Sequence, residues 1–288
     1  MKHIIASLAL ALLSFPMLNA DENPQRNPVG ATFMQKKYEM PRGTYLMSCN
    51  GYEIYTIAVS DKVNFSQPAS LFYGENDSDR LKVDTVAPSG EIPSSMNCFL
   101  VKADGDYILF DAGLSPSKGG MTIQRLTALN LSPTKIKAVF LTHSHSDHIG
   151  GLFDESGKAA FPDAIIYISK DEFDYMKGFK AEEIRKIEEA YPDRVKVFGF
   201  GEILSHNILP ISATGHTPGH TAFRLGNILF AGDIMHGASI QLLYPEINAN
   251  YDADRHKAAE TRARLLDYAV SNSLTVFGAH IPLNGVLF

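Results

Sequence analysis

The sequence predicts a mixed α/β (α+β) fold with β-sheets inside and helices outside. Two observations predict it: short apolar runs typical of strands dominate the chain, and amphipathic helical segments are interspersed among them. The 288 residues are 45% hydrophobic and 20% charged, which excludes a disordered, collagen-like or low-complexity chain. A formal charge of −6 argues against nucleic acid or an anionic membrane as a partner.

The first 20 residues are typical of a secretory signal peptide. Lys2 begins a short basic start, residues 4–13 are almost wholly apolar, and Ala20 supplies the small residue at the cleavage site. The run is shorter than the roughly 20 apolar residues that a membrane span needs. A buried N-terminal helix is the alternative, but the charged, proline-rich residues 21–28 follow at once. We therefore expect a periplasmic or secreted protein without a membrane segment.

The rest of the chain is expected to comprise an extended arm over residues 21–44 and one domain over residues 45–288. An oxidising compartment would allow Cys49 and Cys98 to form a disulfide. The sequence cannot place their Cα atoms within the ~4.4–6.8 Å that a disulfide requires. Two separate thiols, with Cys98 buried in a strand, are the favoured interpretation.

The first half of the domain is predicted to be mostly strands. They are expected at residues 52–60, 97–102, 107–111 and 138–141. The first is rich in β-branched and aromatic residues, the next two flank the hairpin dipeptide Asp104-Gly105, and the last is wholly apolar. Helical spacing predicts a helix over residues 121–129. The polar segment 71–90 is expected to be a loop.

The second half repeats this mixture. Strands are expected at residues 164–168, 195–198, 208–213, 221–225, 228–231 and 274–277. Helices are expected at residues 171–177, 181–191 and 254–269. The second helix is rich in Glu and Lys and should be exposed, whereas the third carries Leu265 and Leu266 on an apolar side.

Three imidazoles and one carboxylate crowd into six positions directly after the strand 138–141. They belong to His143, His145, Asp147 and His148. Zinc and similar divalent ions prefer these ligand types, at about 2.0–2.2 Å. His143 and His145 would face one ion, and Asp147 and His148 a neighbouring one. A polar surface loop that contains histidines by chance is improbable, since the whole chain has 10 His.

Three further strand ends carry residues of the same types. His216 follows the strand 208–213, Asp233 follows 228–231, and His280 follows 274–277. Each alone would more often be an ordinary loop residue. Because strand ends at one edge of a sheet deliver convergent side chains, the four strand ends together predict a metal site.

These residues resemble the metallo-β-lactamase superfamily. The resemblance covers about residues 95–285, and it runs through residues 109–113, residues 143–148, His216, Asp233 and His280. Residues 215–221 and 232–236, followed by Gln241, most resemble the secreted branch of methyl parathion hydrolases and quorum-quenching lactonases. The implied fold is a four-layer αββα metallo-β-lactamase sandwich. The chain stops eight residues after His280, where relatives usually add a strand, so the edge of the second sheet is expected to differ.

The resemblance also implies two divalent metal ions, with Zn²⁺ the first choice and Mn, Fe or Co as alternatives. The first ion would be held by His143, His145 and His216, and the second by Asp147, His148 and His280, with Asp233 bridging them. Two such ions share a hydroxide whose pKa is brought towards about 7, and one ion polarises the carbonyl or phosphoryl oxygen. Asp147 and Asp233 are thus expected to serve catalysis.

Five other positions have expected roles outside the set of metal ligands. Asp111 resembles the family's carboxylate that accepts a ring N–H from a ligand His, the alternative being a turn residue. His220 is expected to be structural. His236 is expected to line the pocket as a catalytic hydrogen-bond donor, or as a wall residue without a chemical role. His206 and His256, in polar stretches, are expected to be solvated.

Two apolar segments are candidates for the wall of the substrate pocket. For residues 71–73 ordinary packing is favoured. For residues 242–244 the pocket is favoured.

The lead hypothesis for function is a secreted dinuclear hydrolase of a small ester or lactone, with phosphotriesters as further substrates. Asp233 argues against a β-lactamase, where Cys or no bridging ligand is usual. A glutathione thioester hydrolase needs a basic patch, but residues 265–288 contain no Lys or Arg. Acidic charge and secretion argue against a nuclease. A mononuclear iron oxidoreductase and a non-catalytic metal-binding protein remain alternatives, and relatives of this branch often form homodimers.

Overall fold

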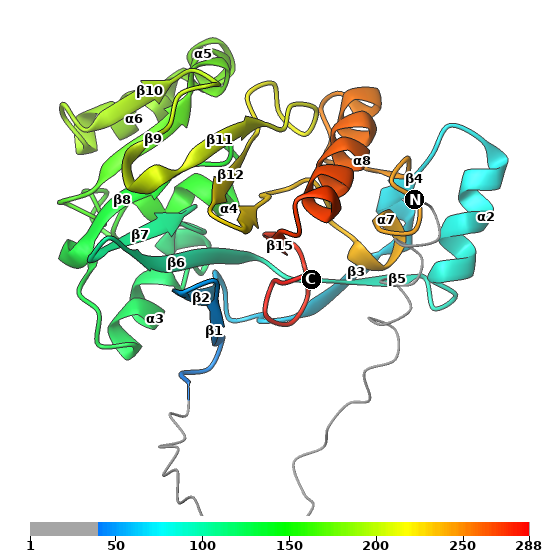
Figure 1. The fold of residues 1–288 in the computed structure, drawn as a ribbon, viewed down its shortest axis with the longest axis horizontal. Helices are drawn as coiled ribbons and strands as arrows, with labels where there is room; N and C mark the ends of the chain where they lie inside the picture. The colour runs from blue at the N-terminus through cyan, green and yellow to red at the C-terminus, as the bar shows by residue number, and fades with distance from the viewer. Residues whose placement is uncertain (1–39, 288) are drawn as a thin grey trace, which may run out of the picture.

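The computed structural model describes residues 40–287, and its secondary structure follows the predicted order closely (Figure 1). The signal peptide expected at residues 1–20 and most of the expected arm lie outside the described residues. Thr44, which we assigned to the arm, instead begins the first strand. Its amide donates to Pro41 O at 2.9 Å, which turns the chain into that strand.

The larger sheet has seven strands in the order β1-β2-β6-β7-β8-β9-β10. These are β1 (Thr44–Cys49), β2 (Tyr52–Ala58), β6 (Asn97–Ala103), β7 (Asp106–Phe110), β8 (Ile136–Phe140), β9 (Ile165–Ser169) and β10 (Val195–Phe198). β6 and β7 form the predicted hairpin, in which Asp104 and Gly105 have φ of 52° and 89°. Positive φ at both central residues is what a type I′ turn requires.

The smaller sheet has four strands in the order β11-β12-β13-β15. These are β11 (Leu209–Ser212), β12 (Thr221–Leu225), β13 (Ile228–Phe230) and β15 (Thr275–Phe277). The C-terminal tail folds back along β15: Leu287 N donates to Val276 O at 2.9 Å, and Phe277 bridges to Val286. The tail therefore covers the sheet edge for which the sequence predicted a difference from the family.

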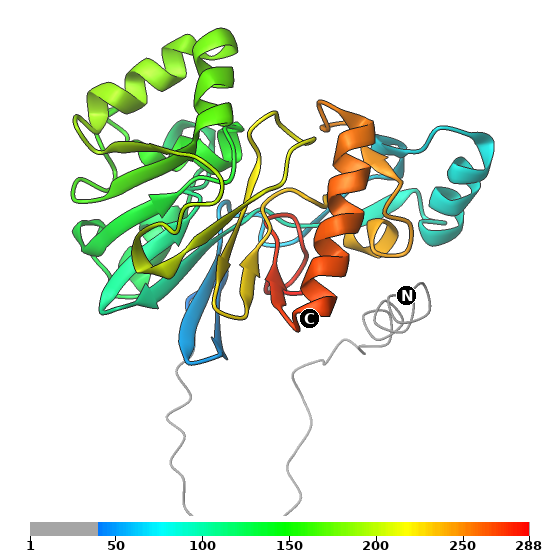
Figure 2. The same cartoon turned by 45° about the horizontal axis from the view of Figure 1, so that its top comes forward.

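The two sheets pack face to face over an aromatic core. Phe110 of β7 stacks on Phe230 of β13 with ring centroids 3.8 Å apart. Side chains alternate along a strand, so Leu109 points to the opposite face, where helices cover the sheet. Those helices are α3 (Thr122–Ala128), α5 (Lys170–Phe179) and α6 (Ala181–Ala190). α8 (Arg255–Ser271) covers the smaller sheet, which completes the predicted αββα sandwich (Figure 2).

The segment 71–90 is not the loop that the sequence predicted. It contains β4 (Phe72–Tyr73) and α2 (Asp77–Val86). The Asn76 side chain accepts the Asp79 amide at 3.2 Å and caps the helix, whose first turn is acidic. The polar cluster that we interpreted as a turn is therefore a helix start.

Several short elements were not predicted. They are β3 (Phe65–Pro68), β5 (Glu91–Ser94), α4 (Ser146–Ile149), α7 (Ala238–Gln241) and β14 (Asn248–Ala249). β3 pairs with β5, and β4 pairs with β14. The two small sheets lie beside the sandwich (Figure 1), and residues of β3 and β5 line the site described below.

The two cysteines are separate thiols, as favoured from the sequence. Cys49 Sγ lies 3.3 Å from Thr275 Oγ1, whereas Cys98 is buried in β6. Burial raises the pKa of the Cys98 thiol to about 12. Among residues 40–287, no helix combines the length and the apolar composition that crossing a membrane requires.

Candidate metal centre

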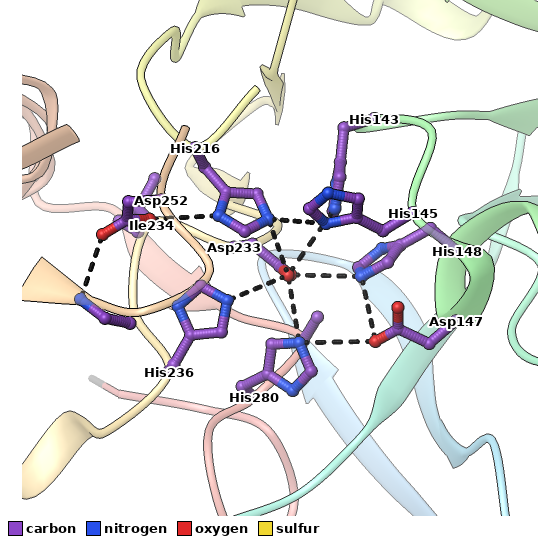
Figure 3. Close-up of polar contacts among 12 residues, drawn as sticks. His143, His145, Asp147, His148, His216, Asp233, Ile234, His236, Asp252 and His280 are labelled. Carbon is purple, nitrogen blue, oxygen red and sulfur yellow. Dashed lines mark hydrogen bonds and ion pairs between the residues drawn. The ribbon is translucent and has the colours of Figure 1, made fainter. Parts of the chain in front are cut away.

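The seven predicted ligands and His236 meet at one edge of the sandwich (Figure 3). The carboxyl ends of β8 in the larger sheet and of β11, β13 and β15 in the smaller sheet lie at this edge. His143 and His145 follow β8, His216 follows β11, Asp233 follows β13, and His280 follows β15. A parallel arrangement of strands commonly places a site at such an edge.

The first group consists of three imidazoles and one carboxylate. One ligand atom each from His143, His145, His216 and Asp233 lie within 4.8 Å of one another. Nε2 of His216 is 2.9 Å from Nδ1 of His145 and 3.4 Å from Oδ2 of Asp233.

The second group consists of Asp147, His148 and His280, again with ligand atoms within 4.8 Å. Oδ1 of Asp233 lies 3.3 Å from Nε2 of His148, while Oδ2 lies 3.0 Å from Nε2 of His280. Because Oδ2 also faces His216 of the first group, Asp233 stands between the two groups.

Several buried polar atoms of this centre have no hydrogen-bond partner among residues 40–287. They are Nε2 of His143, Nε2 of His148, Oδ1 of Asp233 and Nδ1 of His236. Leaving such atoms buried and unpaired is costly. Imidazole nitrogens and carboxylate oxygens that face one another without partners fit divalent cations.

At this centre a carboxylate with a lowered pKa lies among imidazoles with raised pKa values. Burial alone would raise the pKa of Asp233, but neighbouring His148 and His280 hold it well below its usual range. Burial alone would lower the pKa of the His148 and His280 imidazoles. The neighbouring carboxylates, of which Asp233 has the largest effect, outweigh burial. They raise the pKa of His148 well above its usual range and the pKa of His280 to about 9. Burial, followed by the charge of His216, lowers the pKa of His145 to about 3, so this ring keeps a lone pair for an ion.

Asp111 orients one of the predicted ligands, as the resemblance implies. Its Oδ2 lies 2.8 Å from Nδ1 of His148, and its two oxygens accept the amide and the hydroxyl of Thr142 at 2.8 Å each. Asp111 has a φ of 63°, a left-handed conformation that places the carboxylate under the metal-binding loop.

His220 is structural, as expected. Its Nδ1 donates to Ala213 O at 2.9 Å, and its Nε2 accepts the Asp233 amide at 3.0 Å. Burial lowers the pKa of His220 to about 3, so the ring stays neutral and can do both. The neutral ring ties the end of β11 to the backbone of the central carboxylate.

Sequence reasoning missed two buried acidic residues that support the ligands. Oδ1 of Asp252 lies 3.1 Å from Nδ1 of His216. Glu172 accepts hydrogen bonds from the Ser144 amide, beside His143, and from the Thr217 hydroxyl and the Gly219 amide, which follow His216. In the sequence, Asp252 is a loop residue before a helix and Glu172 an acid in a helix's first turn, and both positions are common for acids without any role at a site.

A cavity of about 480 Å³ opens onto the centre. Its apolar wall consists of Phe65, Pro68, Leu71, Met96, Leu114 and Tyr251, and no Lys or Arg among residues 40–287 lines it. Residues 242–244, which we expected to wall the pocket, do not line it. α7 and its C-cap instead direct Leu242 into the core beneath α8. Of residues 71–73, Leu71 lines the cavity whereas Phe72 packs into a core cluster.

The remaining histidines have distinct environments. His236 lines the cavity, and its buried Nε2 lies 3.3 Å from Oδ2 of Asp233. Burial, opposed by its hydrogen bond to Asp233, lowers the pKa of His236 to about 4. His256 is exposed, as predicted. The solvated position expected for His206 is wrong: it is half-buried, with Nδ1 3.8 Å from Oδ2 of Asp104.

Comparison with known proteins places this centre in a family. Residues 93–280 match the model of the Metallo-beta-lactamase superfamily. The hydroxyacylglutathione hydrolase of Stenotrophomonas maltophilia is 27% identical over 198 residues, 66% of each chain. The uncharacterized protein YobT of Bacillus subtilis is 29% identical over 149 residues, 48% of this chain and 61% of YobT. The matched regions thus cover just under two thirds of these relatives' lengths.

Solved structures share the fold over more of the chain. The hydrolase AbOPH of the beta-lactamase superfamily superimposes with a TM-score of 0.74 at 27% identity, over 85% of this chain and 92% of AbOPH. AidC, a dizinc quorum-quenching lactonase in complex with a homoserine product, has a TM-score of 0.70 at 24% identity, with the same coverage.

Proposed function

Because the chain belongs to the metallo-β-lactamase superfamily, we propose that it is a dinuclear hydrolase of small, neutral esters or lactones. The observation that carries this proposal is the position of Asp233 between two groups of converging ligand atoms, of which Nε2 of His143, Nε2 of His148 and its own Oδ1 are buried without a partner. The apolar cavity that opens onto them gives a small substrate access to the centre.

In the proposed centre, each group of side chains would hold one ion. His143, His145 and His216 would hold the first, Asp147, His148 and His280 the second, and Asp233 both. When bound, such ions supply an activated water as nucleophile and polarise the substrate's carbonyl or phosphoryl oxygen. Asp111 and Asp252 hold the rings of His148 and His216 in the orientation that turns Nε2 of each ring to the centre.

We assign His236 the handling of the reacting oxygens. Its ring is buried and neutral, and it lines the cavity beside Asp233. Nε2–H, which faces Oδ2 of Asp233 at 3.3 Å, would turn its hydrogen bond to a substrate oxygen that gains negative charge once Asp233 holds the ions. The ring lies against that of His280, with centroids 4.9 Å apart, which limits its movement.

The cavity wall favours a neutral substrate with an apolar substituent. A glutathione thioester carries carboxylates, and in the described part of the chain no Lys or Arg lines the cavity to pair with them. The similarity to a hydroxyacylglutathione hydrolase nevertheless makes thioester hydrolysis the second candidate. The similarity in fold to the dizinc lactonase AidC supports the first. The signal-peptide pattern of residues 1–20 supports action outside the cytoplasm.

The test is metal analysis of the purified protein, combined with four substrates: an acyl homoserine lactone, a neutral phosphotriester, a cephalosporin and a glutathione thioester. We expect two metals per chain and turnover of the lactone or the phosphotriester. Asp233→Ala should lose metal and turnover together, whereas Asp267→Ala, at an exposed position on α8, should lose neither. One metal per chain with no hydrolysis would contradict the proposal, and turnover of the thioester alone would replace its substrate class.

A further inference from the structure

Glu172 is a fully buried carboxylate that contacts no expected ligand side chain. It lies in the first turn of α5, and 1% of its surface is exposed. Its Oε1 accepts the Ser144 amide at 2.8 Å. Its Oε2 accepts the Thr217 hydroxyl at 2.7 Å and the Gly219 amide at 3.0 Å. One side chain therefore receives three hydrogen bonds from two separate loops.

These two loops carry the three histidines of one group. Ser144 lies between His143 and His145, and Thr217 directly follows His216. Among the described residues, the contacts of Glu172 reach neither the segment of Asp147 and His148 nor that of His280. The carboxylate thus joins the loops of the three-histidine group and leaves the other group to different supports.

The rest of α5 strengthens this connection. Ser169 Oγ donates to Gly219 O at 2.7 Å, and a Cβ on Gly219 would lie 2.0 Å from the Glu172 backbone nitrogen. Only glycine allows the loop to approach the helix so closely. At the other end of α5, Lys180 Nζ donates to Ser144 O at 2.7 Å. The residue between His143 and His145 is therefore held at its amide by Glu172 and at its carbonyl by Lys180.

We propose that Glu172 is a positioning residue that sets the metal affinity of the three-histidine group. The inference rests on the proposed dinuclear centre. Nε2 of His216 and Nδ1 of His145 lie 2.9 Å apart on different loops, and an ion can be shared only while both loops keep their places. Partners that orient ligands typically contribute 10–100-fold to metal affinity. Because the contacts are confined to one group, the loss should fall on one ion of the two.

The experiment compares Glu172→Gln with Asp171→Asn. Both replace a carboxylate by an amide in the first turn of α5, but Asp171 is exposed. In Glu172→Gln an NH₂ group, which donates, replaces one of two oxygens that accept. This NH₂ group faces either the Ser144 amide or the donors of Thr217 and Gly219, so at least one hydrogen bond is lost. Each full-length protein is loaded with Zn²⁺ and titrated with a competing chelator, and the bound metal is counted at each step. His145→Ala identifies the step that belongs to the three-histidine group.

We expect Glu172→Gln to release that one metal at about 10–100-fold lower chelator concentration. The other metal should follow the wild-type curve, as both should in Asp171→Asn. Thr217→Val, which removes a single hydrogen bond, should shift the same step by less, and it serves as the test if the Gln variant does not fold.

Two results would overturn the inference. One is that Glu172→Gln or Thr217→Val releases both metals at the wild-type chelator concentrations while the melting temperature of its metal-free form falls. Glu172 would then have a purely structural role. The other is an equal shift of both metals. A wild-type protein that binds fewer than two metals would instead overturn the proposed centre itself, so the two failures are distinguishable.

Discussion

Asp252 and His216 form a buried pair in which Oδ1 of the carboxylate lies 3.1 Å from Nδ1 of the ring (Figure 3). The other oxygen, Oδ2, accepts from the Arg262 guanidinium at 3.3 Å and from the Ala249 amide at 3.1 Å. A carboxylate at Nδ1 holds a proton on that atom and orients the ring so that Nε2 faces the centre beside His145 and Asp233. Asp252, in the loop before α8, thereby sets the ring orientation of His216, which follows β11.

Replacing Asp252 should weaken metal binding without removing a ligand. In Asp252→Ala the ring of His216 loses its partner and Arg262 is left buried without its carboxylate, so we expect about 10–100-fold lower affinity for one metal. Stability should also fall, by about 3–5 kcal/mol, because breaking a buried pair leaves an uncompensated charge. Chelator titration and urea unfolding measure the two effects. The exposed Asp267→Ala serves as control, and unchanged metal affinity in Asp252→Ala would refute the role.

Metal uptake should release protons near pH 7.5. In the metal-free protein the pKa of His280 is raised to about 9 and that of His148 lies well above its usual range, so both rings are cationic. A ring must be neutral to bind an ion. Calorimetry of Zn²⁺ binding in two buffers of different ionisation enthalpy should therefore give different apparent enthalpies. Identical enthalpies in the two buffers would contradict the assignment.

The pairing of His280 with Asp233 should make the stability of the metal-free protein depend on pH. The folded-state pKa of His280, about 9, lies above its usual value of 6.5. The stabilisation from its pairing with Asp233 is thus fully present below about pH 6.5 and is lost as pH rises through about 9. Melting temperatures of chelator-treated protein should fall across this window. His280→Ala should remove that part of the decline, and an unchanged slope would count against the pair.

His236→Ala should lower turnover while the metal content stays intact. A donor to the reacting oxygens typically contributes 10²–10⁴-fold, and we expect a loss in that range in kcat. The exposed His256→Ala is the matched control. Metal analysis decides between roles, since loss of an ion from His236→Ala would make this residue a ligand and not a hydrogen-bond donor.

The interface between the sheets should dominate stability. Phe110 is completely buried and stacks on Phe230 at 3.8 Å and on Phe140 at 5.4 Å. Phe110→Ala leaves a cavity at the centre of the sandwich and should cost ~3–5 kcal/mol. Phe179→Ala, at a position 80% exposed, should change stability by less than about 0.5 kcal/mol. Chemical unfolding of both variants tests the difference, and similar losses would contradict the observed core.

The signal-peptide prediction concerns residues outside the described part of the chain. If residues 1–20 direct export, protein expressed in a bacterium should accumulate in the periplasm or medium with Asp21 as its first residue. Intact-mass analysis of that fraction measures the cleavage point. Protein that keeps Met1 and stays in the cytoplasm would refute the prediction.

The sequence by itself determined the strands of both large sheets, apart from β1, and the residues that follow them. Strand patterns are local, and a His or Asp directly after an apolar strand inherits the position of the strand end. This is why residues 143–148, His216, Asp233 and His280 could be placed together before the structure was known. The polar segment 71–90 was assigned wrongly because Asn and Asp favour turns and helix N-caps alike.

Only the tertiary structure decided which residues support the site and which wall its cavity. Asp252 lies 36 residues from His216 in the chain, and Glu172 lies 28 residues from Ser144. No local pattern encodes such pairings, because they depend on how the sheets and helices stack. The cavity wall likewise combines β3, β5 and the loop of Tyr251, which meet only after the two small sheets pair beside the sandwich.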